Sequence, residues 1–377
     1  MSTPLDALQR VVDDVVAPSA ADADRHSTYP RAALDALADA GILGLVSSPD
    51  VGGAGAGMDA AAQVVERLAG ACGSTAMVVL MHYAAVPVIE AFGPKDVREA
   101  IAAGRHVTTL AFSETGSRSH FWAPMSTAVE QDGGVRLDAA KSWVTSAGEA
   151  DSYVWSSRPL AAEGPMTLWL VPSDAPGLSV AGPFDGLGLR ANRSTPVTAD
   201  GVVVPLDAML GGDGRGLDVA LTRTLPWFLV LNAAFSLGLM EAVTAEAVAH
   251  LTSTRLDHLN RSLSEQPVVR LDLARIRVET DRTRAFLDDT LAALASGRAD
   301  AMLRVLEVKA AAAESAIDVT DRAMKICGGA AFRKELGIER RFRDARAARV
   351  MAPTTDALLD FVGRAICGMP LVDEVPA

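Results

Sequence analysis

The chain has 377 residues, of which 49% are hydrophobic and 22% are charged. This length allows two or three domains around a substantial core, and the composition is that of an ordinary globular protein. The formal net charge of −12 argues against nucleic acid as a partner, because binding a phosphate backbone requires a basic face. The N-terminus lacks a basic block followed by an apolar run, and no uninterrupted apolar span reaches about 18 residues. We therefore expect a soluble, cytoplasmic protein without a membrane partner.

The three cysteines are widely spaced and form no C-x-x-C pair. They are Cys72, Cys327 and Cys367. An odd number with this spacing indicates neither a disulfide framework nor a metal site. We expect no bound metal and interpret all three as buried small hydrophobic residues.

Residues 1–105 consist of alanine-rich windows with leucines at helical spacing, separated by glycine and proline. This pattern predicts an all-α N-terminal domain. The expected helices are Leu5 to Val16 (ending before Pro18), Pro30 to Ala40, Asp59 to Ala71 and Thr75 to Phe92. The glycine-rich segment 50–57 is interpreted as a loop, because it lacks the preceding strand and the spacing of a dinucleotide fingerprint.

Residues 106–213 contain short apolar or alternating runs between Gly, Pro and Asp turns, which predict an antiparallel β domain, either a sandwich or a barrel. The expected strands are Val107–Ser113, Thr127–Glu130, Val135–Ala139, Ser152–Ser156, Thr167–Val171, Leu178–Ala181 and Val202–Val204. Trp155 and Trp169 are interpreted as core residues.

Two segments of this middle part carry chemistry. The strand ending at Ser113 stops at a polar turn, Glu114–Ser117, which presents backbone N–H groups to whatever lies above it. After a hairpin at residues 132–134, the chain returns through Lys141–Ser146, where strand alternation predicts Trp143 and Thr145 on one face. A flat aromatic ring beside a hydroxyl suits a planar heteroaromatic ligand.

Residues 214–377 show four helical windows, and two of them have apolar stripes at steps of three and four residues. The windows are about Leu225–Leu251, Val269–Leu291, Val305–Ile326 and Thr355–Cys367. Stripes of this length predict that the helices pack as a four-helix bundle.

Several of these segments closely resemble the acyl-CoA dehydrogenase family. In its flavin-binding middle domain the matching residues are Ser113 to His120, then Lys141 to Ser146, then Ala150-Asp151. The C-terminal part matches through Lys325-Ile326-Cys327-Gly328-Gly329 and Arg343-Asp344-Ala345-Arg346. The resemblance implies an α+β protein with an N-terminal all-α domain, a middle β domain and a C-terminal four-helix bundle, assembled as a homodimer or homotetramer.

The resemblance also implies FAD as cofactor, with FMN less favoured. The residues that it assigns to the flavin are Leu110, Phe112, Ser113, Ser119, Trp143, Thr145, Arg255, Gly328, Gly329 and Thr354. In the family, the arginine at the position of Arg255 comes from a neighbouring subunit and holds the flavin diphosphate. Here Asp257-His258-Leu259 replaces the usual Thr-Phe-Gly beside it.

The chain departs from the family where the catalytic base normally stands. The usual glutamate position is Ala352, and the alternative position on the first bundle helix aligns near Phe228. Removing the α-proton of a thioester requires a positioned base. Asp356 follows nearby but is interpreted as a residue of a helix start.

Three functions therefore remain open. The first is an FAD-dependent oxidoreductase acting on an acyl thioester, of CoA or of an acyl carrier, or on a related small molecule, with flavin N5 as hydride acceptor. The second is a monooxygenase of the same fold, supplied by a flavin reductase and using O2, for which His82 is the candidate catalytic residue. His120, where the family has Asp, favours the same alternative. A lone histidine in an apolar helix is more often a hydrogen-bonded core residue, and this alternative stays open for His82. The third is a non-catalytic flavin-binding paralogue.

Overall fold

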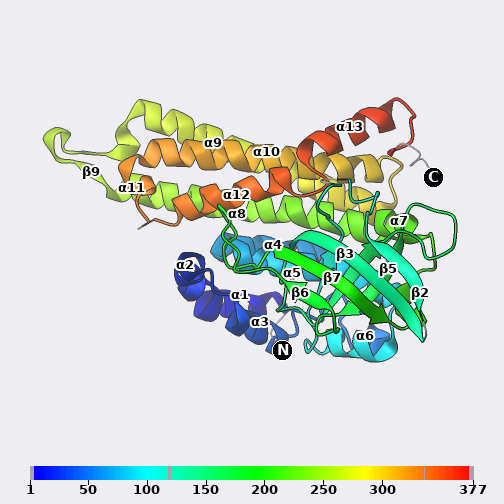
Figure 1. Cartoon of the computed structure of the whole chain (residues 1–377). Coiled ribbons are helices and arrows are strands. Elements are labelled where there is room, and N and C mark those ends of the chain that lie inside the picture. Colours follow the sequence, from blue (N-terminus) through cyan, green and yellow to red (C-terminus); the bar gives the residue numbers. More distant parts are fainter. Residues whose placement is uncertain (1–3, 118–119, 132, 335, 373–377) are drawn as a thin grey trace.

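The computed structural model describes residues 4–117, 120–131, 133–334 and 336–372. Figure 1 shows the long C-terminal helices lying across the N-terminal helices and the β sheets. The N-terminal part is helical, as predicted. Its helices are α1 (Pro4–Val11), α2 (Ala17–His26), α3 (Arg31–Asp39), α4 (Met58–Ala71), α5 (Gly73–Phe92) and α6 (Lys95–Ala102), with a π-helix, η1 (Val12–Val16), between α1 and α2.

The predicted end of the first helix at Pro18 is wrong. The chain stays helical through η1 and α2 to His26. Pro18 directly follows the π-helical turn η1, a local irregularity at which a continuous helix can accommodate a residue without an N–H. A proline in a helical pattern therefore does not by itself end the helix.

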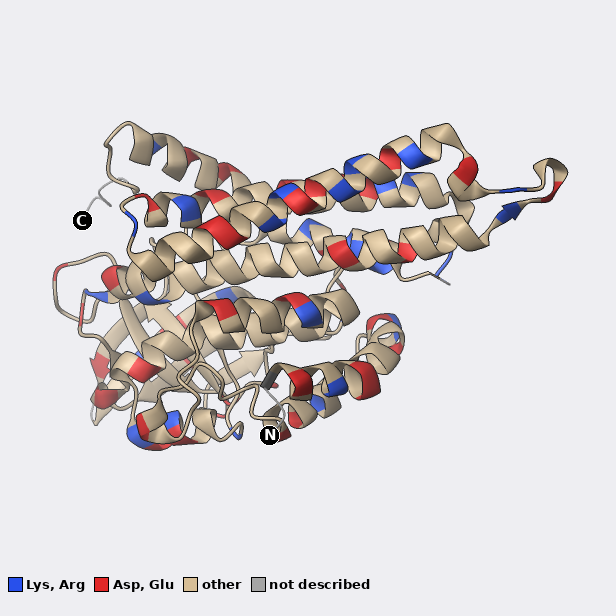
Figure 2. Cartoon of the chain, turned by 180° about the vertical axis from the view of Figure 1, so that it is seen from behind, with Lys and Arg blue, Asp and Glu red and all other residues tan. Residues whose placement is uncertain are grey.

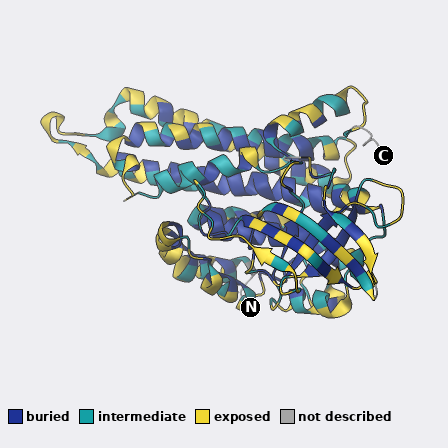
Figure 3. Cartoon of the chain, viewed as in Figure 1, coloured by how far each residue is buried: buried dark blue, intermediate teal, exposed yellow. Residues whose placement is uncertain are grey.

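Helix α5 is the centre of the N-terminal domain, and it packs against α4, α8 and β1. This helix and the helical segment Gly216–Ser253 are long and apolar enough to span a membrane. Their most apolar windows are 78% and 83% buried inside the protein, respectively, which is the environment of a core helix. Figure 3 shows this burial along the interior of the molecule.

The middle part forms two four-stranded sheets. The first has the order β1 (Thr108–Ala111), β4 (Ser152–Ser157), β5 (Thr167–Pro172) and β8 (Met209–Leu210). The second has the order β2 (Thr127–Gln131), β3 (Gly134–Val144), β7 (Thr195–Val204) and β6 (Leu178–Val180). Neighbouring strands pair antiparallel except β1 and β4, which are parallel. Trp155 and Trp169 face each other across β4 and β5 and are fully buried, which confirms their core interpretation.

Several predicted strand boundaries differ from the structure. The segments 135–139 and 141–146, predicted separately, are joined in the strand β3, which ends at Val144. Its register on β7 shifts twice, between Leu137 and Ala139 and between Lys141 and Val144. Irregularities of this kind let a long strand bend. Strand β7 begins at Thr195, well before the predicted Val202.

The C-terminal part is a helix bundle, as predicted, of α8 (Leu225–Ser253), α9 (Pro267–Ser296), α10 (Ala301–Cys327) and α13 (Thr355–Ile366). Short elements precede α8, namely α7 (Gly216–Val219) and the π-helix η4 (Ala220–Thr224), and α11 (Gly329–Phe332) follows α10. A two-stranded hairpin of β9 (Arg255–Leu256) and β10 (Arg261–Ser262) links α8 to α9. Figure 2 shows acidic and basic residues interspersed along the outer faces of the long helices.

Helix α12 (Ile338–Val350) was not predicted, because its many arginines hide the apolar period. It nevertheless packs against α8 and α10. The interpretation of the cysteines needs one correction. Cys72 and Cys327 are buried, but Cys367 is exposed because it directly follows the last helix, α13.

Candidate functional site

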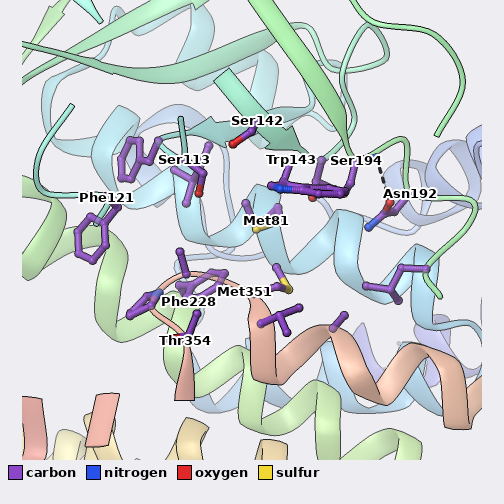
Figure 4. A pocket seen from close by; sticks show the side chains of 18 of the residues that line it. Met81, Ser113, Phe121, Ser142, Trp143, Asn192, Ser194, Phe228, Met351 and Thr354 are labelled. Atoms are coloured by element: carbon purple, nitrogen blue, oxygen red, sulfur yellow. Dashed lines mark hydrogen bonds between the residues drawn. The ribbon is translucent and has the colours of Figure 1, made fainter. Parts of the chain in front are cut away.

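A cavity of about 910 Å³ lies where the three parts of the chain meet. Its walls come from the ends of β1 and β3, from α5, from the start of α8, and from the segment between α12 and α13 (Figure 4). Six of the residues predicted to bind flavin line it. They are Leu110, Phe112, Ser113, Trp143, Thr145 and Thr354.

The two predicted segments run side by side at the cavity. Ser142 N donates to Ser113 O at 2.9 Å, and Thr115 N donates to Ala140 O at 3.1 Å. Ser113 and Trp143 consequently lie on the same wall of the cavity (Figure 4).

Trp143 does not follow simple strand alternation. Its backbone is left-handed, with φ of 55°, a conformation that a bulky residue adopts only when its surroundings impose it. The register shift between Lys141 and Val144 lies at the same place. The indole ring is 68% exposed, whereas Thr145 is buried and its hydroxyl contacts Ser194 Oγ at 2.9 Å.

A buried ion pair connects these two segments. Lys141 Nζ donates to Glu114 Oε1 at 2.5 Å and to Ser156 O at 2.6 Å. Burial alone would raise the pKa of Glu114, but Lys141 and the hydrogen bonds from Ser126 and Met125 hold it below its usual value. Both residues belong to the segments that resemble the family, yet no pattern in the sequence indicates that they pair.

The arginine-rich segment of α12 holds another wall of the cavity in place. Both terminal nitrogens of Arg343 donate to Asp24, at 2.9 and 2.6 Å, which ties α12 to the N-terminal domain. The Asp344 carboxylate accepts from Leu189 N at 2.7 Å, and burial raises the pKa of Asp344 to about 6. These contacts hold the cavity-lining loop 186–189 against α12, so this basic run is part of the site rather than a solvated face.

His82 does not belong to the lining of this cavity. It is fully buried, its Nε2 lies 3.1 Å from Leu43 O, and its Nδ1 accepts from Thr108 N at 3.2 Å. Burial lowers the pKa of His82 to about 4, so the ring is neutral and has a hydrogen-bond partner at both nitrogens. The geometry does not support the predicted catalytic role, because neither nitrogen is available to a substrate.

His120 also lies outside the cavity lining, although its neighbour Phe121 belongs to it. The His120 ring is exposed and packs edge-on against Trp122, with ring centroids 4.9 Å apart. Trp122 in turn contacts Phe361 of α13. The histidine therefore helps to shape the loop beside the cavity without facing its interior.

Both positions at which the family carries its base lie on the cavity, as Ala352 and Phe228. Among the described residues that line the cavity, the charged ones are Glu114, Arg343 and Arg346, and all three are held in hydrogen bonds. Asp356 is exposed and does not line the cavity. The described walls thus offer hydroxyl and amide groups but no free carboxylate or imidazole.

The remaining predicted flavin residues lie elsewhere. Arg255 is exposed in the β9–β10 hairpin, where it donates to Asn260. Gly328 is the N-cap of α11, and Gly329 is its first residue. Figure 1 places β9 and α11 at the end of the bundle opposite the β sheets. Ser119 lies outside the described residues.

The cavity residues fit a flat aromatic group. Trp143 leaves most of a large apolar ring uncovered at the cavity wall, and a stacked planar ligand would cover it. Ser113, Ser142 and Thr145 place hydroxyl groups on the same cavity. The isoalloxazine ring of a flavin has this shape and carries polar atoms along its edge.

Family models match almost the whole chain. They are described as the acyl-CoA dehydrogenase N-terminal domain (residues 4–104), middle domain (109–202) and C-terminal domain (214–367). The chain belongs to the acyl-CoA dehydrogenase family. It is thus a member of a family of flavin-dependent oxidoreductases, and its three-part fold is that of the family.

The relatives match 90% or more of the chain. The human mitochondrial short-chain specific acyl-CoA dehydrogenase is 26% identical over 348 residues, covering 90% of this chain and 83% of that protein. The structure of butyryl-CoA dehydrogenase from Megasphaera elsdenii superimposes with a TM-score of 0.89 at 22% identity, covering 97% of this chain and 100% of the other. A structure described as the FAD complex of PigA has a TM-score of 0.87 at 18% identity and covers 98% of both chains.

Proposed function

We propose that the protein is an FAD-dependent oxidoreductase that binds the isoalloxazine ring in the cavity between Ser113 and Trp143. The observation that carries this proposal is the exposed Trp143 ring beside Ser113, which follows β1, with six of the predicted flavin residues on one cavity. The similar fold of PigA, whose structure is described as an FAD complex, supports the choice of cofactor. When bound, the flavin supplies a two-electron acceptor.

The residues of the cavity wall also support a substrate class. Its described walls include Met81, Phe121, Leu225 and Phe228, which favour a small and largely apolar substrate portion. We propose an acyl thioester or a related small molecule that is oxidised by hydride transfer to the flavin. The names of the human and Megasphaera relatives, both acyl-CoA dehydrogenases, support this choice.

Ala352 limits such a reaction. A positioned general base contributes roughly 10²–10⁴-fold to proton transfer, and the alanine side chain cannot accept a proton. We therefore expect simple saturated acyl-CoAs to reduce the flavin slowly. The substrate that the enzyme uses must lose its proton by a route other than a carboxylate at position 352.

The experiment is the Ala352→Glu variant. If the cavity holds FAD and an acyl thioester in the manner of the family, a carboxylate at position 352 should speed anaerobic bleaching of the flavin by butyryl-CoA by at least about 10²-fold. Met351→Glu, the neighbouring cavity residue, is the matched control and should give no such gain. No acceleration in Ala352→Glu, with flavin bound, would count against thioester dehydrogenation.

Monooxygenation is the second candidate, and the lack of a free base among the described cavity residues favours it. Reduced flavin reacting with O2 requires no abstraction of an α-proton. Oxygen uptake that depends on an added flavin reductase and on a substrate, without anaerobic bleaching by any acyl-CoA, would select this candidate.

We propose that FAD binding also requires a second copy of the chain. Arg255, Gly328 and Gly329 lie at the end of the bundle remote from the cavity, so in this chain they are not placed to contact a flavin stacked on Trp143. A homodimer or homotetramer would bring this end of one copy to the cavity of another. Arginine is suited to holding the diphosphate through paired hydrogen bonds.

A further inference from the structure

Lys309 of α10 is a buried lysine that holds one wall of the cavity. The residue is 1% exposed, and its Nζ donates to two backbone carbonyls, Met351 O at 3.1 Å and Pro353 O at 2.8 Å. Both acceptors belong to the segment 351–354 between α12 and α13, and every residue of this segment lines the cavity. Lys309 itself does not belong to the lining, so it contacts the wall without facing the interior.

The partners of Lys309 are unusual for a buried lysine. Lys141, which is equally buried, pairs with the Glu114 carboxylate at 2.5 Å. Lys309 instead binds neutral carbonyls, and the carboxylate that acts on its pKa, Glu314, is engaged by Arg349. Burial lowers the pKa of Lys309 to about 7. An apolar side chain at this position would avoid the cost of burying an ammonium group, so the lysine requires an explanation.

Capping of α12 explains only one of the two hydrogen bonds. Met351 is the C-cap of α12, and lysine side chains commonly bind the last carbonyls of a helix. Pro353 lies beyond that end, so its carbonyl is not part of the helix. The bond from Lys309 to Pro353 O therefore fixes the turn between the helices rather than the end of α12.

The two acceptors flank Ala352, the position at which the family carries its base. The helices hold the two ends of the segment, because Met351 N donates to Ala347 O and Thr354 O accepts from Leu358 N. Lys309 holds the carbonyls on both sides of Ala352, which restrains the backbone and hence the direction of the bond from Cα to Cβ. Figure 4 shows Met351 and Thr354 across the cavity from Trp143. The restrained residue thus belongs to the wall that faces a ring stacked on Trp143.

We propose that Lys309 is a positioning residue, which fixes position 352 against the reacting part of the substrate through Met351 O and Pro353 O. It acts through the backbone of this segment and touches neither substrate nor flavin. This inference rests on the proposed function, since that function places the substrate against this wall. The required precision is high, because a displacement of about 1 Å can cost roughly 100-fold in rate.

The functional test uses the FAD-loaded Ala352→Glu protein, in which a carboxylate reports where the wall stands. Anaerobic bleaching of the flavin by butyryl-CoA gives a rate constant at saturation and a Kd. Adding Lys309→Met, which keeps a long side chain but has no donor, should lower the rate constant by about 10- to 100-fold and change the Kd by less than about threefold. Lys309→Gln keeps an N–H donor and should retain more of the rate than Lys309→Met.

The rate constants are compared on the plateau of their pH profiles. Removing the Lys309 charge can shift the pKa of a carboxylate at position 352, and the plateau excludes this cause. A rate that recovers fully on the plateau would contradict a displaced wall.

Val319→Ala is the matched control for general destabilisation. Val319 lies on the same helix, is fully buried, and has no polar group with which to hold the segment. Added to Ala352→Glu, this truncation should lower the melting temperature by leaving a cavity, but it should not slow bleaching. The assignment is overturned if Val319→Ala slows bleaching as much as Lys309→Met, or if Lys309→Met does not slow it.

Hydrogen exchange measured by mass spectrometry gives a readout without turnover. Lys309→Met removes a buried charge and leaves an adaptable apolar side chain, so the variant should fold. In FAD-loaded protein it should speed exchange in peptides that cover residues 351–358, while peptides of α9 exchange as in the wild type. Val319→Ala should not speed exchange selectively in residues 351–358. If Lys309→Met does not fold, Lys309→Gln takes its place in both measurements.

The two proposals fail in different ways. An Ala352→Glu protein that bleaches no faster than the wild type counts against the proposed function, whereas faster local exchange in Lys309→Met would still support the hold of Lys309 on this wall. Faster exchange without slower bleaching in the double variant shows a structural role only and refutes positioning. Unchanged exchange in Lys309→Met refutes the inference outright.

Discussion

The two ends of the C-terminal bundle differ in how much of the site they complete. At the cavity end, residues from all three parts of the chain meet, and hydrogen bonds and a buried ion pair hold them in place. At the far end, Arg255 is exposed and donates only within its own hairpin, to Asn260, among the described residues. Apart from their chain neighbours, no described residue comes within 4 Å of where a Cβ would stand on Gly328 or Gly329. The cavity end is thus built within one chain, whereas the far end is available to another molecule.

The largest expected difference between the two ends is in stability. Glu114→Gln leaves the Lys141 ammonium buried without its carboxylate, which should cost about 3–5 kcal/mol in the free energy of unfolding. The exposed Arg255→Ala should change it by less than about 0.5 kcal/mol. Denaturant unfolding of both variants measures the contrast.

The double variant Glu114→Gln with Lys141→Met is the control for that prediction. It removes both charges, so it should be more stable than Glu114→Gln alone. If the single variant unfolds at the wild-type denaturant concentration, the ion pair does not brace the cavity wall.

A second prediction concerns pH, and it applies to the cavity end. The pKa of His82 is about 4 in the folded protein, against an ordinary value of 6.5, because burial disfavours its charge. The unfolded chain therefore binds this proton first, so stability is complete above pH 6.5 and falls as the pH is lowered toward 4, by about 3 kcal/mol. Thermal unfolding between pH 7 and 4.5 measures the loss.

His82→Gln isolates this contribution. Glutamine can donate to Leu43 O and accept from Thr108 N without titrating, so the variant should lose less stability on acidification than the wild type. The raised pKa of Asp344 acts in the opposite direction below pH 6 in both proteins and cancels in the comparison. Parallel pH curves for the two proteins would contradict the assignment.

A smaller effect is expected at the far end, and it concerns flavin affinity. If Arg255 holds the diphosphate of FAD bound by another copy, Arg255→Ala should weaken FAD binding by about 10- to 100-fold while the fold stays intact. Arg261→Ala, in the partner strand β10 of the same hairpin, is the matched control and should have little effect. Titration of apoprotein with FAD measures both, and equal Kd values for Arg255→Ala and the wild type would remove the far end from the site.

The sequence was sufficient to locate the helices and strands whose apolar residues recur at a clear period. Stripes of apolar residues located α9 and α10, and alternation located most strands. It was insufficient where a partner distant in the chain decides the structure. Helix α12 is stabilised by Arg343 binding Asp24 across the domains, which no local pattern can show. Likewise, the two predicted strands within β3 join because β7 pairs with both.

The residues of the candidate site also divide into those that a sequence motif located and those that it did not. The resemblance to the family placed Ser113, Trp143, Thr145 and Thr354 on one cavity because a sequence motif carries each of them. For His82 the sequence left two alternatives open, a core residue and a catalytic one, since a histidine in an apolar helix does not reveal whether its ring faces a cavity or the backbone of Leu43.

The flavin content of the purified protein tests the central claim most directly. After reconstitution with FAD, the absorbance spectrum should show about one flavin per chain, and Trp143→Ala should lose most of it while unfolding like the wild type, because its ring is 68% exposed. A wild-type protein that stays colourless, or a Trp143→Ala protein that binds FAD as tightly as the wild type, would contradict the placement of the flavin against Trp143.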